Sequence, residues 1–162
     1  MKIWSRIKRL SSRGLLQFGW LFLKNPLLVV PTLNATKRTF RICNDLYGNS
    51  HHKSNKANAF RHALWNILIC LETSKKIKNS QKSVVFTEKV TTLYEKATKN
   101  ELLDEAMDLR NNEIGRALFF KYLDKNEEEI VDLIQKRLKN AQKVSKIEEI
   151  QNFKDELVYI SD

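Results

Sequence analysis

Two stretches of the sequence carry chemically capable polar side chains at a spacing that gathers them on one helix face. The first, which we call the first polar stripe, consists of Asn58, Arg61, His62, Trp65 and Asn66. The second polar stripe consists of Asp108, Asn111, Asn112, Gly115 and Arg116. In both, the members follow the first one at intervals of three, four, seven and eight residues, which is the repeat of a single helix face.

The composition of the two polar stripes differs from that of an ordinary solvated helix surface. Such surfaces are built from Lys, Glu and Gln, whereas Asn and Asp compete for backbone hydrogen bonds and are poor helix formers. Each Asn or Asp costs roughly 0.5 kcal/mol of helix stability, and a glycine inside a helix costs about 1 kcal/mol relative to Ala. We therefore expect the two stripes to face each other or a shared cavity, with a close approach at Gly115.

Two interpretations of the stripes follow from the residues alone. In the first, they form a satisfied buried network in which Asp108 pairs with Arg61 or Arg116. In the second, they form a site where His62 and Asp108 act as acid and base or bind a metal. The other polar side chains would then bind the substrate or an anion, and they are Asn58, Arg61, Trp65, Asn66, Asn111, Asn112 and Arg116.

At these stripes the chain resembles a bacterial helical domain family of unknown function. Members of that family carry an RHAxW motif, a later His-Glu pair and a DxHNNxxGR motif. They occur as free-standing proteins and at the ends of polymorphic toxin-like proteins. The matching residues are Arg61, His62, Ala63 and Trp65, then Glu95, then Asp108, Asn111, Asn112, Gly115 and Arg116. The resemblance covers residues 31–123 of this chain.

Two departures from the family motifs bear on the expected activity. Tyr94 stands where the resemblance implies a histidine before the glutamate, and Arg110 stands where it implies one before the Asn pair. With both histidines absent, only three ligands would remain for a divalent metal, and they are His62, Glu95 and Asp108. The resemblance therefore implies a hydrolase-like member that is atypical or has lost its activity.

The stripes and the resemblance together predict a polar pocket between helices that acts on phosphoester or lipid substrates. His62, Glu95 and Asp108 are the candidate catalytic residues, with His62 or Glu95 as general base. Arg61 and Arg116 would stabilise an anion. The alternative is a non-catalytic binding module whose basic N-terminal third contacts an anionic membrane or nucleic acid. The chain contains no GxGxxG, GxxxxGK[ST], GxSxG or HExxH motif, so dinucleotide, P-loop and serine-hydrolase chemistry are set aside.

A second group of histidines lies in the polar segment between Gly48 and Lys56. His51 and His52 are adjacent there, and histidines on a loop are able to bind a metal or to sense pH. Exposed histidines without a role are the more common case. Together with the residues of the polar stripes, these histidines complete the set of candidate metal ligands, which are His51, His52, His62 and Asp108.

The positive charge of the chain is concentrated at its beginning. The formal net charge is +10, and residues 1–62 alone hold 12 basic residues and one acid, a difference of 12 − 1 = +11. Such asymmetry predicts a polyanionic partner. The basic segment 36–41 is able to grip phosphate, but no helix-turn-helix, zinc-finger or RNA-binding signature accompanies it, so we favour an anionic membrane over nucleic acid.

Residues 1–24 form a basic, amphipathic N-terminal segment. It lacks the small-residue cleavage site of a signal peptide, and its apolar run is too short to span a bilayer. It would either dock on the domain or lie on anionic lipid. Cys43 and Cys70 show no zinc or CxxC spacing and are expected to be free, buried thiols. Together these features predict a cytoplasmic protein that is peripheral at the inner membrane if the segment binds lipid.

The long periodic stretches and the scarcity of Gly and Pro predict an all-α fold. We expect a single domain, residues 1–162, formed by an orthogonal bundle of about five to six helices. The expected helices are 15–24, 35–46 with Asn34 as its cap, 56–77, 84–96, 101–123 and 127–142, with a stiff turn at Pro26 and Pro31. The apolar segment 157–160 is expected to be a short extended strand or an apolar clip on the core.

Overall fold

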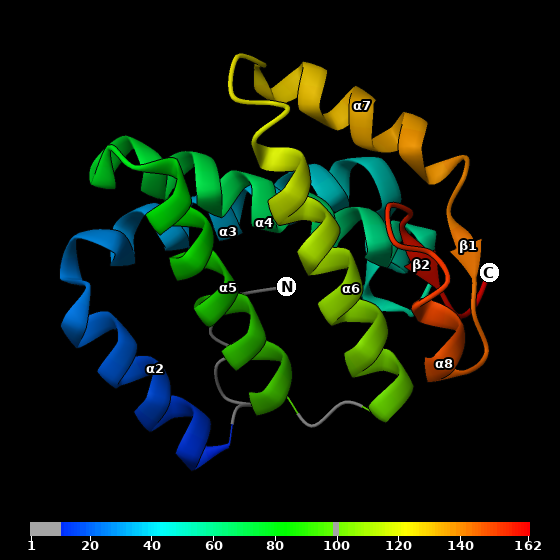
Figure 1. Ribbon diagram of the computed structural model, residues 1–162, viewed down its shortest axis with the longest axis horizontal. Helices are drawn as coiled ribbons and strands as arrows, with labels where there is room; N and C mark the ends of the chain where they lie inside the picture. Colours follow the sequence, from blue (N-terminus) through cyan, green and yellow to red (C-terminus); the bar gives the residue numbers. More distant parts are fainter. Residues whose placement is uncertain (1–10, 99–100) are drawn as a thin grey trace.

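The computed structural model describes residues 11–98 and 101–162, which form an all-α bundle with one very small sheet (Figure 1). The first half contains α2 (Ser12–Lys24), the 3-10 turn η1 (Pro26–Leu28), α3 (Val29–Tyr47), the 3-10 turn η2 (Gly48–His52) and α4 (Lys56–Ile77). The second half contains α5 (Ser80–Ala97), α6 (Leu102–Phe119), α7 (Glu127–Leu138), β1 (Gln142–Lys143), α8 (Ile147–Ile150) and β2 (Val158–Tyr159). The predicted fold class is confirmed. Residues 1–10 of the predicted basic, amphipathic segment 1–24 lie outside the described residues.

Helix α4 is the centre of the molecule. It carries apolar and polar buried residues on nearly all sides, and α3, α5, α6 and α7 pack around it. Its first turn is capped by Asn55, whose side chain accepts a hydrogen bond from the amide of Asn58, and it ends at Lys78 in the left-handed conformation. The sequence predicted the bounds of this helix correctly.

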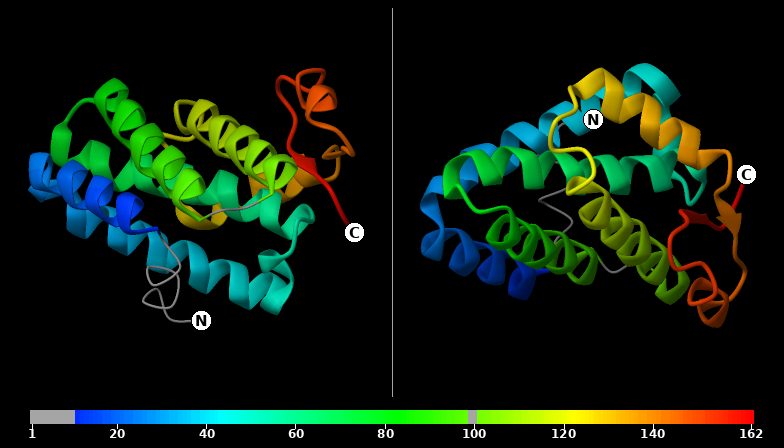
Figure 2. Two further views of the ribbon diagram at one scale, coloured as in Figure 1. Left: turned by 90° about the horizontal axis from the view of Figure 1, so that it is seen from below. Right: turned by 45° about the horizontal axis from the view of Figure 1, so that its top comes forward.

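Helices α5 and α6 lie side by side and cross α4 steeply, as both the first view and its rotations show (Figures 1 and 2). Asn79 caps α5 by accepting from the amide of Lys82, and α6 begins with Asp104 and Glu105, which suit the positive end of a helix dipole. This crossing brings the middle of α6 and one turn of α5 against the same segment of α4.

The predicted start of the second helix was wrong. Helix α3 begins at Val29, so Pro31 lies in its first turn and Asn34 is an exposed residue inside the helix, not its cap. Proline is compatible with that first turn because the amide group that it lacks would have no partner there. Only Pro26 belongs to a turn, η1. The ends of the last two predicted helices were also placed too late, since α6 ends at Phe119 and α7 at Leu138.

The C-terminal segment closes the fold as a short parallel strand pair. Gln142 pairs with Val158 and Lys143 with Tyr159. Asn111 of α6 holds the strand from the other side: its amide nitrogen donates to the carbonyl of Val158 at 2.8 Å, and its oxygen accepts from the amide of Val158 at 3.0 Å. The segment is thus both of the expected things, a strand and a buried apolar clip.

Helix α2 docks on the body of the protein along α5. Gly14 of α2 lies so close to α5 that a β-carbon there would lie 2.6 Å from the Cβ of Ala97, closer than two such carbons can approach. Phe22 packs edge-on against Phe86 of α5, with ring centroids 6.3 Å apart. Within the described residues, no helix is long and apolar enough to cross a membrane.

Both cysteines are buried and free, as expected. Burial raises the pKa of the Cys43 thiol to about 12 and that of the Cys70 thiol to about 11. Thiols of this kind remain protonated at neutral pH and are poor nucleophiles, so we assign them to the core.

Candidate functional site

The two polar stripes face each other across the contact between α4 and α6. Their closest approach is at Gly115, where a β-carbon would lie 2.9 Å from both the Cα of Ala63 and the Cβ of Asn66, and would also meet the carbonyl of Ala63. A side chain of any size is therefore excluded at this position. The expected close approach at Gly115 is present, and its cause is backbone contact with α4.

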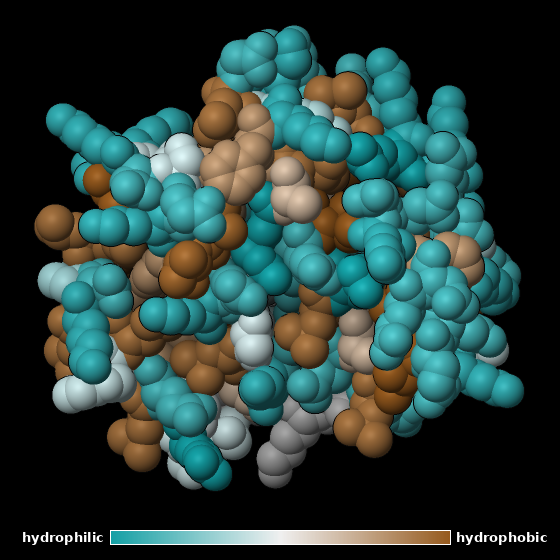
Figure 3. All heavy atoms as spheres, viewed as in Figure 1, coloured by the Kyte–Doolittle hydropathy of each residue, from teal (hydrophilic) through white to brown (hydrophobic). Residues whose placement is uncertain are grey.

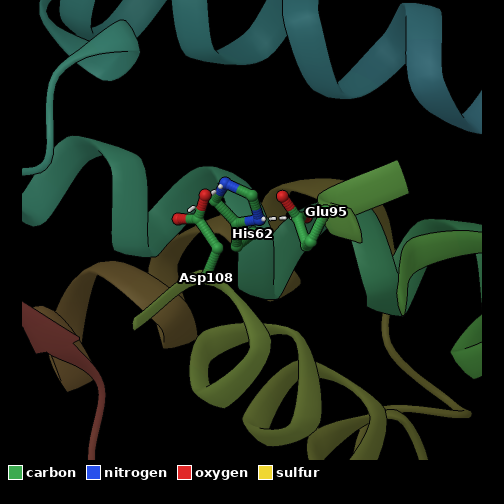
Figure 4. Close-up of side chains that lie close together, drawn as sticks. All are labelled: His62, Glu95 and Asp108. Carbon is green, nitrogen blue, oxygen red and sulfur yellow. Dashed lines mark ion pairs between the residues drawn. The ribbon is translucent and has the colours of Figure 1, made fainter. Parts of the chain in front are cut away.

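A buried cluster of three titratable side chains lies at this contact (Figure 4). His62 comes from α4, Glu95 from α5 and Asp108 from α6. Nδ1 of His62 lies 3.4 Å from Oε1 of Glu95, and Nε2 lies 3.1 Å from Oδ1 of Asp108. The imidazole therefore has a carboxylate beside each ring nitrogen, and all three side chains are buried.

Asn112 determines which nitrogen of His62 carries the proton. Its amide nitrogen donates to Oε1 of Glu95 at 3.0 Å, so its oxygen is turned toward α4. That oxygen lies 3.0 Å from Nδ1 of His62 and also accepts from the amide of Asn66 at 2.6 Å. Because an amide oxygen is only an acceptor, Nδ1 must donate, and Nε2 of the neutral imidazole holds the lone pair.

The lone pair of Nε2 faces Arg61 and Asp108. Nη2 of Arg61 lies 2.6 Å from Nε2, and Nη1 of the same guanidinium donates to the backbone carbonyl of His51. Arg61 is itself buried, so a permanent positive charge is held next to the basic nitrogen. Such a pairing places a proton acceptor and an anion-binding group side by side.

Burial and the neighbouring charges of the cluster change the pKa of Asp108. Burial raises the pKa of this carboxyl to about 6; His62 and Arg61 lower it, whereas Glu95 and Asp104 raise it. A carboxyl that titrates near neutral pH is able to exchange a proton with a neighbouring imidazole, because neither protonation state is strongly favoured.

The same three side chains are the described residues best placed to hold a metal ion. One donor atom from each of His62, Glu95 and Asp108 lies within 4.8 Å of the others. Asp108 and Glu95 approach opposite nitrogens of the ring, however, so a metal bound to either nitrogen would require one carboxylate to turn. His51 and His52 lie outside this group; their rings contact each other, with centroids 3.9 Å apart, and His51 is buried against Asn44.

The remaining stripe residues divide between the cluster and its surroundings. Asn66 links the stripes through Asn112, and its oxygen accepts from Nη1 of Arg116 at 3.1 Å. Arg116 lies behind Asn66, with Glu88 at 3.9 Å, so it has no direct contact with the cluster. Asn111 is occupied by β2, and the buried Asn58 contributes to the first turn of α4.

The two positions that depart from the resembled motifs lie in different places. Tyr94 packs edge-on against Trp65, with centroids 5.3 Å apart, next to the cluster. Arg110 instead pairs with Glu113 at 2.9 Å on the outer side of α6. A side chain at position 110 therefore lies away from His62, and the arginine there removes nothing from the cluster.

A cavity of about 270 Å³ leads to the Arg61 and His62 end of the cluster. It lies between α2, α3, α4 and α5, and its walls are mainly apolar side chains: Leu15, Phe18, Phe22, Leu33, Phe40 and Val90. Arg61 and His62 are at the cavity wall together with Trp65 and Tyr94. The sequence predicted a polar pocket built from the two stripes, whereas this cavity is mainly apolar. Its apolar lining was not foreseen, because apolar residues at helical spacing ordinarily indicate core.

The basic segment 36–41 is partly neutralised by acids from other helices. Arg38 of α3 donates to Glu72 of α4 at 2.8 Å and also pairs with Glu127 of α7. Arg41 lies 3.6 Å from Glu127. These ion pairs leave fewer cations for a phosphate backbone than the sequence alone implied.

Fold and site together define an all-α domain with a buried His/Glu/Asp cluster at the end of an apolar cavity. Comparison with family models matches residues 19–142 to a family described as Domain of unknown function (DUF6973). The match covers well over half of the 162 residues, and the chain belongs to this family. No curated protein and no solved structure matches it.

Proposed function

We propose that this protein is a hydrolase that cleaves an ester or phosphoester bond at His62. The observation that carries the proposal is the buried imidazole at a cavity wall, with one carboxylate beside each of its ring nitrogens. A carboxylate next to the protonated nitrogen holds the tautomer and stabilises the imidazolium that forms during general-base catalysis. The arrangement also explains why polar residues unfavourable to helices are gathered here.

The chemical step uses the lone pair of His62 Nε2. A water molecule attacks the carbonyl carbon or phosphorus of the substrate and passes its proton to Nε2 as the new bond forms. The resulting imidazolium is stabilised by Glu95 near Nδ1 and by Asp108 near Nε2. The bond to the leaving oxygen then breaks, and this oxygen receives the proton from Nε2.

Arg61 stabilises the negative charge that develops on the substrate. Its guanidinium lies 2.6 Å from Nε2 in the protein described here, and it would turn its donors to the substrate oxygen. Burial raises the pKa of Asp108 to about 6, so this carboxyl is able to hold a proton near neutral pH and to share the transferred proton with His62. A divalent metal held by the same three side chains would polarise the substrate in place of Arg61.

Hydrolysis assays on the purified protein test this proposal. The panel contains phosphomonoesters, phosphodiesters and carboxylic esters with short and long alkyl chains, each with EDTA and with added Zn²⁺, Mn²⁺ or Mg²⁺. We expect His62→Gln to lower kcat/KM by about 100-fold or more, the usual size of a lost general base. His52→Gln, a histidine outside the cluster, serves as control and should leave kcat/KM unchanged. Hydrolysis of no substrate, or full activity of His62→Gln, would contradict the proposal.

A second candidate function is contact with an anionic membrane through α2 and the start of α3. Brown side chains protrude over α2 in Figure 3, and the most exposed large apolar residues of this face are Leu16, Trp20, Leu23, Leu27 and Val30. Lys24 lies 4.5 Å from the centre of the Trp20 ring. Residues 12–44 contain Arg13, Lys24, Lys37, Arg38 and Arg41 and no acid. Exposed aromatic and aliphatic groups beside cations are typical of helices at a lipid surface.

Co-sedimentation with vesicles tests the membrane contact. Leu23 and Leu102 are both 76% exposed, but only Leu23 belongs to the α2 face, so Leu23→Glu and Leu102→Glu form a matched pair. We expect Leu23→Glu to abolish binding to phosphatidylglycerol vesicles and Leu102→Glu to retain it. Equal binding by the two variants would rule out this surface, and binding only of nucleic acid in a parallel assay would favour the other polyanion.

A further inference from the structure

The walls of the cavity are suited to a hydrocarbon chain. Besides its apolar side chains, the cavity is lined by Thr32, Thr36 and Thr39, whose hydroxyls donate to backbone carbonyls of their own helix at 2.7, 2.7 and 2.9 Å. The indole nitrogen of Trp65 donates to Oγ1 of Thr36 at 2.9 Å. These polar groups are therefore already satisfied, and the wall that they form favours an apolar ligand.

The size and opening of the cavity point in the same direction. A volume of about 270 Å³ exceeds the ~150 Å³ of an apolar cavity known to accept benzene. Leu15 of α2 and Leu33 of α3 line the cavity and are nevertheless 42% and 39% exposed, so they belong to its mouth. The mouth thus opens between the two elements that carry the exposed apolar face.

One end of the cavity is charged. Among the described residues that line the cavity, Arg61 carries a permanent positive charge, and none is an Asp or a Glu. A ligand that fills the apolar part and reaches this end would therefore gain from a negative charge at its head. The chemistry that satisfies both parts is that of an amphiphile with one hydrocarbon chain and one anionic group.

We propose that the cavity binds the single hydrocarbon chain of an anionic amphiphile, a fatty acid or a lysophospholipid, with its anionic group at Arg61. The binding itself is independent of catalysis. The head of a chain bound in this way lies beside His62. If the proposed hydrolysis takes place there, an ester of such a chain is its substrate, and this part of the inference rests on the proposed function.

Displacement of a fluorescent fatty acid from the full-length protein measures the binding. Saturated fatty acids of increasing length should bind about fourfold tighter per added methylene, the value expected for burying one CH₂ group, until the cavity is full. Oleate should bind at least about tenfold tighter than oleyl alcohol, which lacks the charge that Arg61 recognises. Oleoyl-lysophosphatidylglycerol in a parallel arm distinguishes a lipid from a free fatty acid as the ligand.

A substitution that fills the cavity provides the decisive variant. Gly19 lines the cavity, and a β-carbon there would meet no atom within 4 Å, so Gly19→Leu adds apolar volume at the cavity wall from an unobstructed position. We expect Gly19→Leu to shorten the chain length at which affinity stops rising and to weaken oleate binding by about tenfold or more. Gln17→Leu, which adds an apolar side chain to the same helix outside the cavity lining, is the control and should bind as the parent does.

The outcomes separate this inference from the proposed function. Chain-length-dependent binding that Gly19→Leu weakens supports the inference, even if no ester is hydrolysed. Absence of binding to both amphiphiles overturns it, and so does binding that Gly19→Leu leaves unchanged. Equal affinity for oleate and oleyl alcohol overturns the assignment of the anionic group to Arg61.

Discussion

At the scale of single residues, His62 depends on partners from three helices, and they depend on it. The side-chain oxygen of Asn112 accepts a hydrogen bond from Nδ1 of His62, and the two carboxylates lie beside the ring. Removing the imidazole would leave buried acceptors and charges without their partner, and the cost of such a loss is set by desolvation. The cluster is therefore expected to contribute to stability as well as to chemistry.

We expect His62→Ala to lower the free energy of unfolding by about 2–4 kcal/mol, because Asn112 and the two carboxylates lose a buried partner. In a protein of this size that corresponds to a fall in Tm of roughly 5–15 °C. Thermal unfolding followed by circular dichroism measures the change. His52→Ala, which removes a histidine from outside the cluster, should cost less, and an equal loss in both variants would argue against the network.

The raised pKa of Asp108 has a consequence for stability that depends on pH. The folded protein holds the proton of Asp108 up to a pH of about 6, whereas the unfolded chain releases it near the ordinary value of 3.8. The contribution of this group is therefore fully present below about pH 4 and is lost as pH rises through about 6, by up to about 3 kcal/mol.

Asp108→Asn removes this titration while retaining the shape of the side chain. Urea unfolding at pH 4.5 and pH 7.5 should show the parent losing stability relative to Asp108→Asn as the pH rises. The four charged groups that act on the pKa of Asp108 remain in both proteins, so the comparison isolates the change at the substituted carboxyl. A difference that stays constant between the two pH values would contradict the raised pKa.

At the scale of the elements, the contact between α4 and α6 at Gly115 positions the cluster. We expect Gly115→Ala to destabilise the protein by roughly 1–3 kcal/mol, because its β-carbon would overlap the backbone of Ala63. The same substitution at Gly19, where a β-carbon meets nothing within 4 Å, should instead stabilise α2 by up to about 1 kcal/mol. Urea unfolding of both variants gives the two signs, and equal signs would refute the steric argument.

The sequence predicted the fold class and the contact between the two polar stripes, whereas it placed several helix ends wrongly. The polar stripes were visible because Asn, Asp and Gly are costly inside helices and their spacing defines a face. The predicted bounds of α4 agree with the structure, in which Asn55 caps its start. The start of α3 was predicted wrongly because a proline usually indicates the end of a helix or a turn. Pro31 lies in the first turn of α3, where a proline does not interrupt the helix.

The cavity and the separation of Arg116 from the cluster could not be predicted for a different reason. The spacing of residues along one helix shows which of them share a face. It does not show which residues of a neighbouring helix that face contacts. Arg116 lies one turn beyond Asn112 on α6, and only the crossing of α4 shows that it contacts Asn66 and not His62. Leu15, Phe18 and Leu33 line the cavity because of the way α2 docks, which depends on contacts distant in the sequence.

At the scale of the whole molecule, Asn111 links the C-terminal strand to the helix that carries Asp108. Replacing it with Ala would leave the buried amide and carbonyl of Val158 without their side-chain partners, at a cost of about 1–3 kcal/mol for each unsatisfied group. We expect faster amide hydrogen exchange at Val158 and Tyr159 in Asn111→Ala than in the parent. Unchanged exchange there, with normal exchange in α4 as internal reference, would show that Asn111 is not needed to hold the strand.

The near-contact of Gly115 with Ala63 also divides the protein into parts of unequal stiffness. Helices α4 and α6 touch backbone to backbone at Gly115 and Ala63, which leaves them little freedom to slide. Helix α2 contacts α5 near Ala97 and through the rings of Phe22 and Phe86, and it is followed by the short turn at Pro26–Leu28. Any widening of the cavity mouth is therefore expected to come from a displacement of α2, and not from the two helices that hold His62 and Asp108.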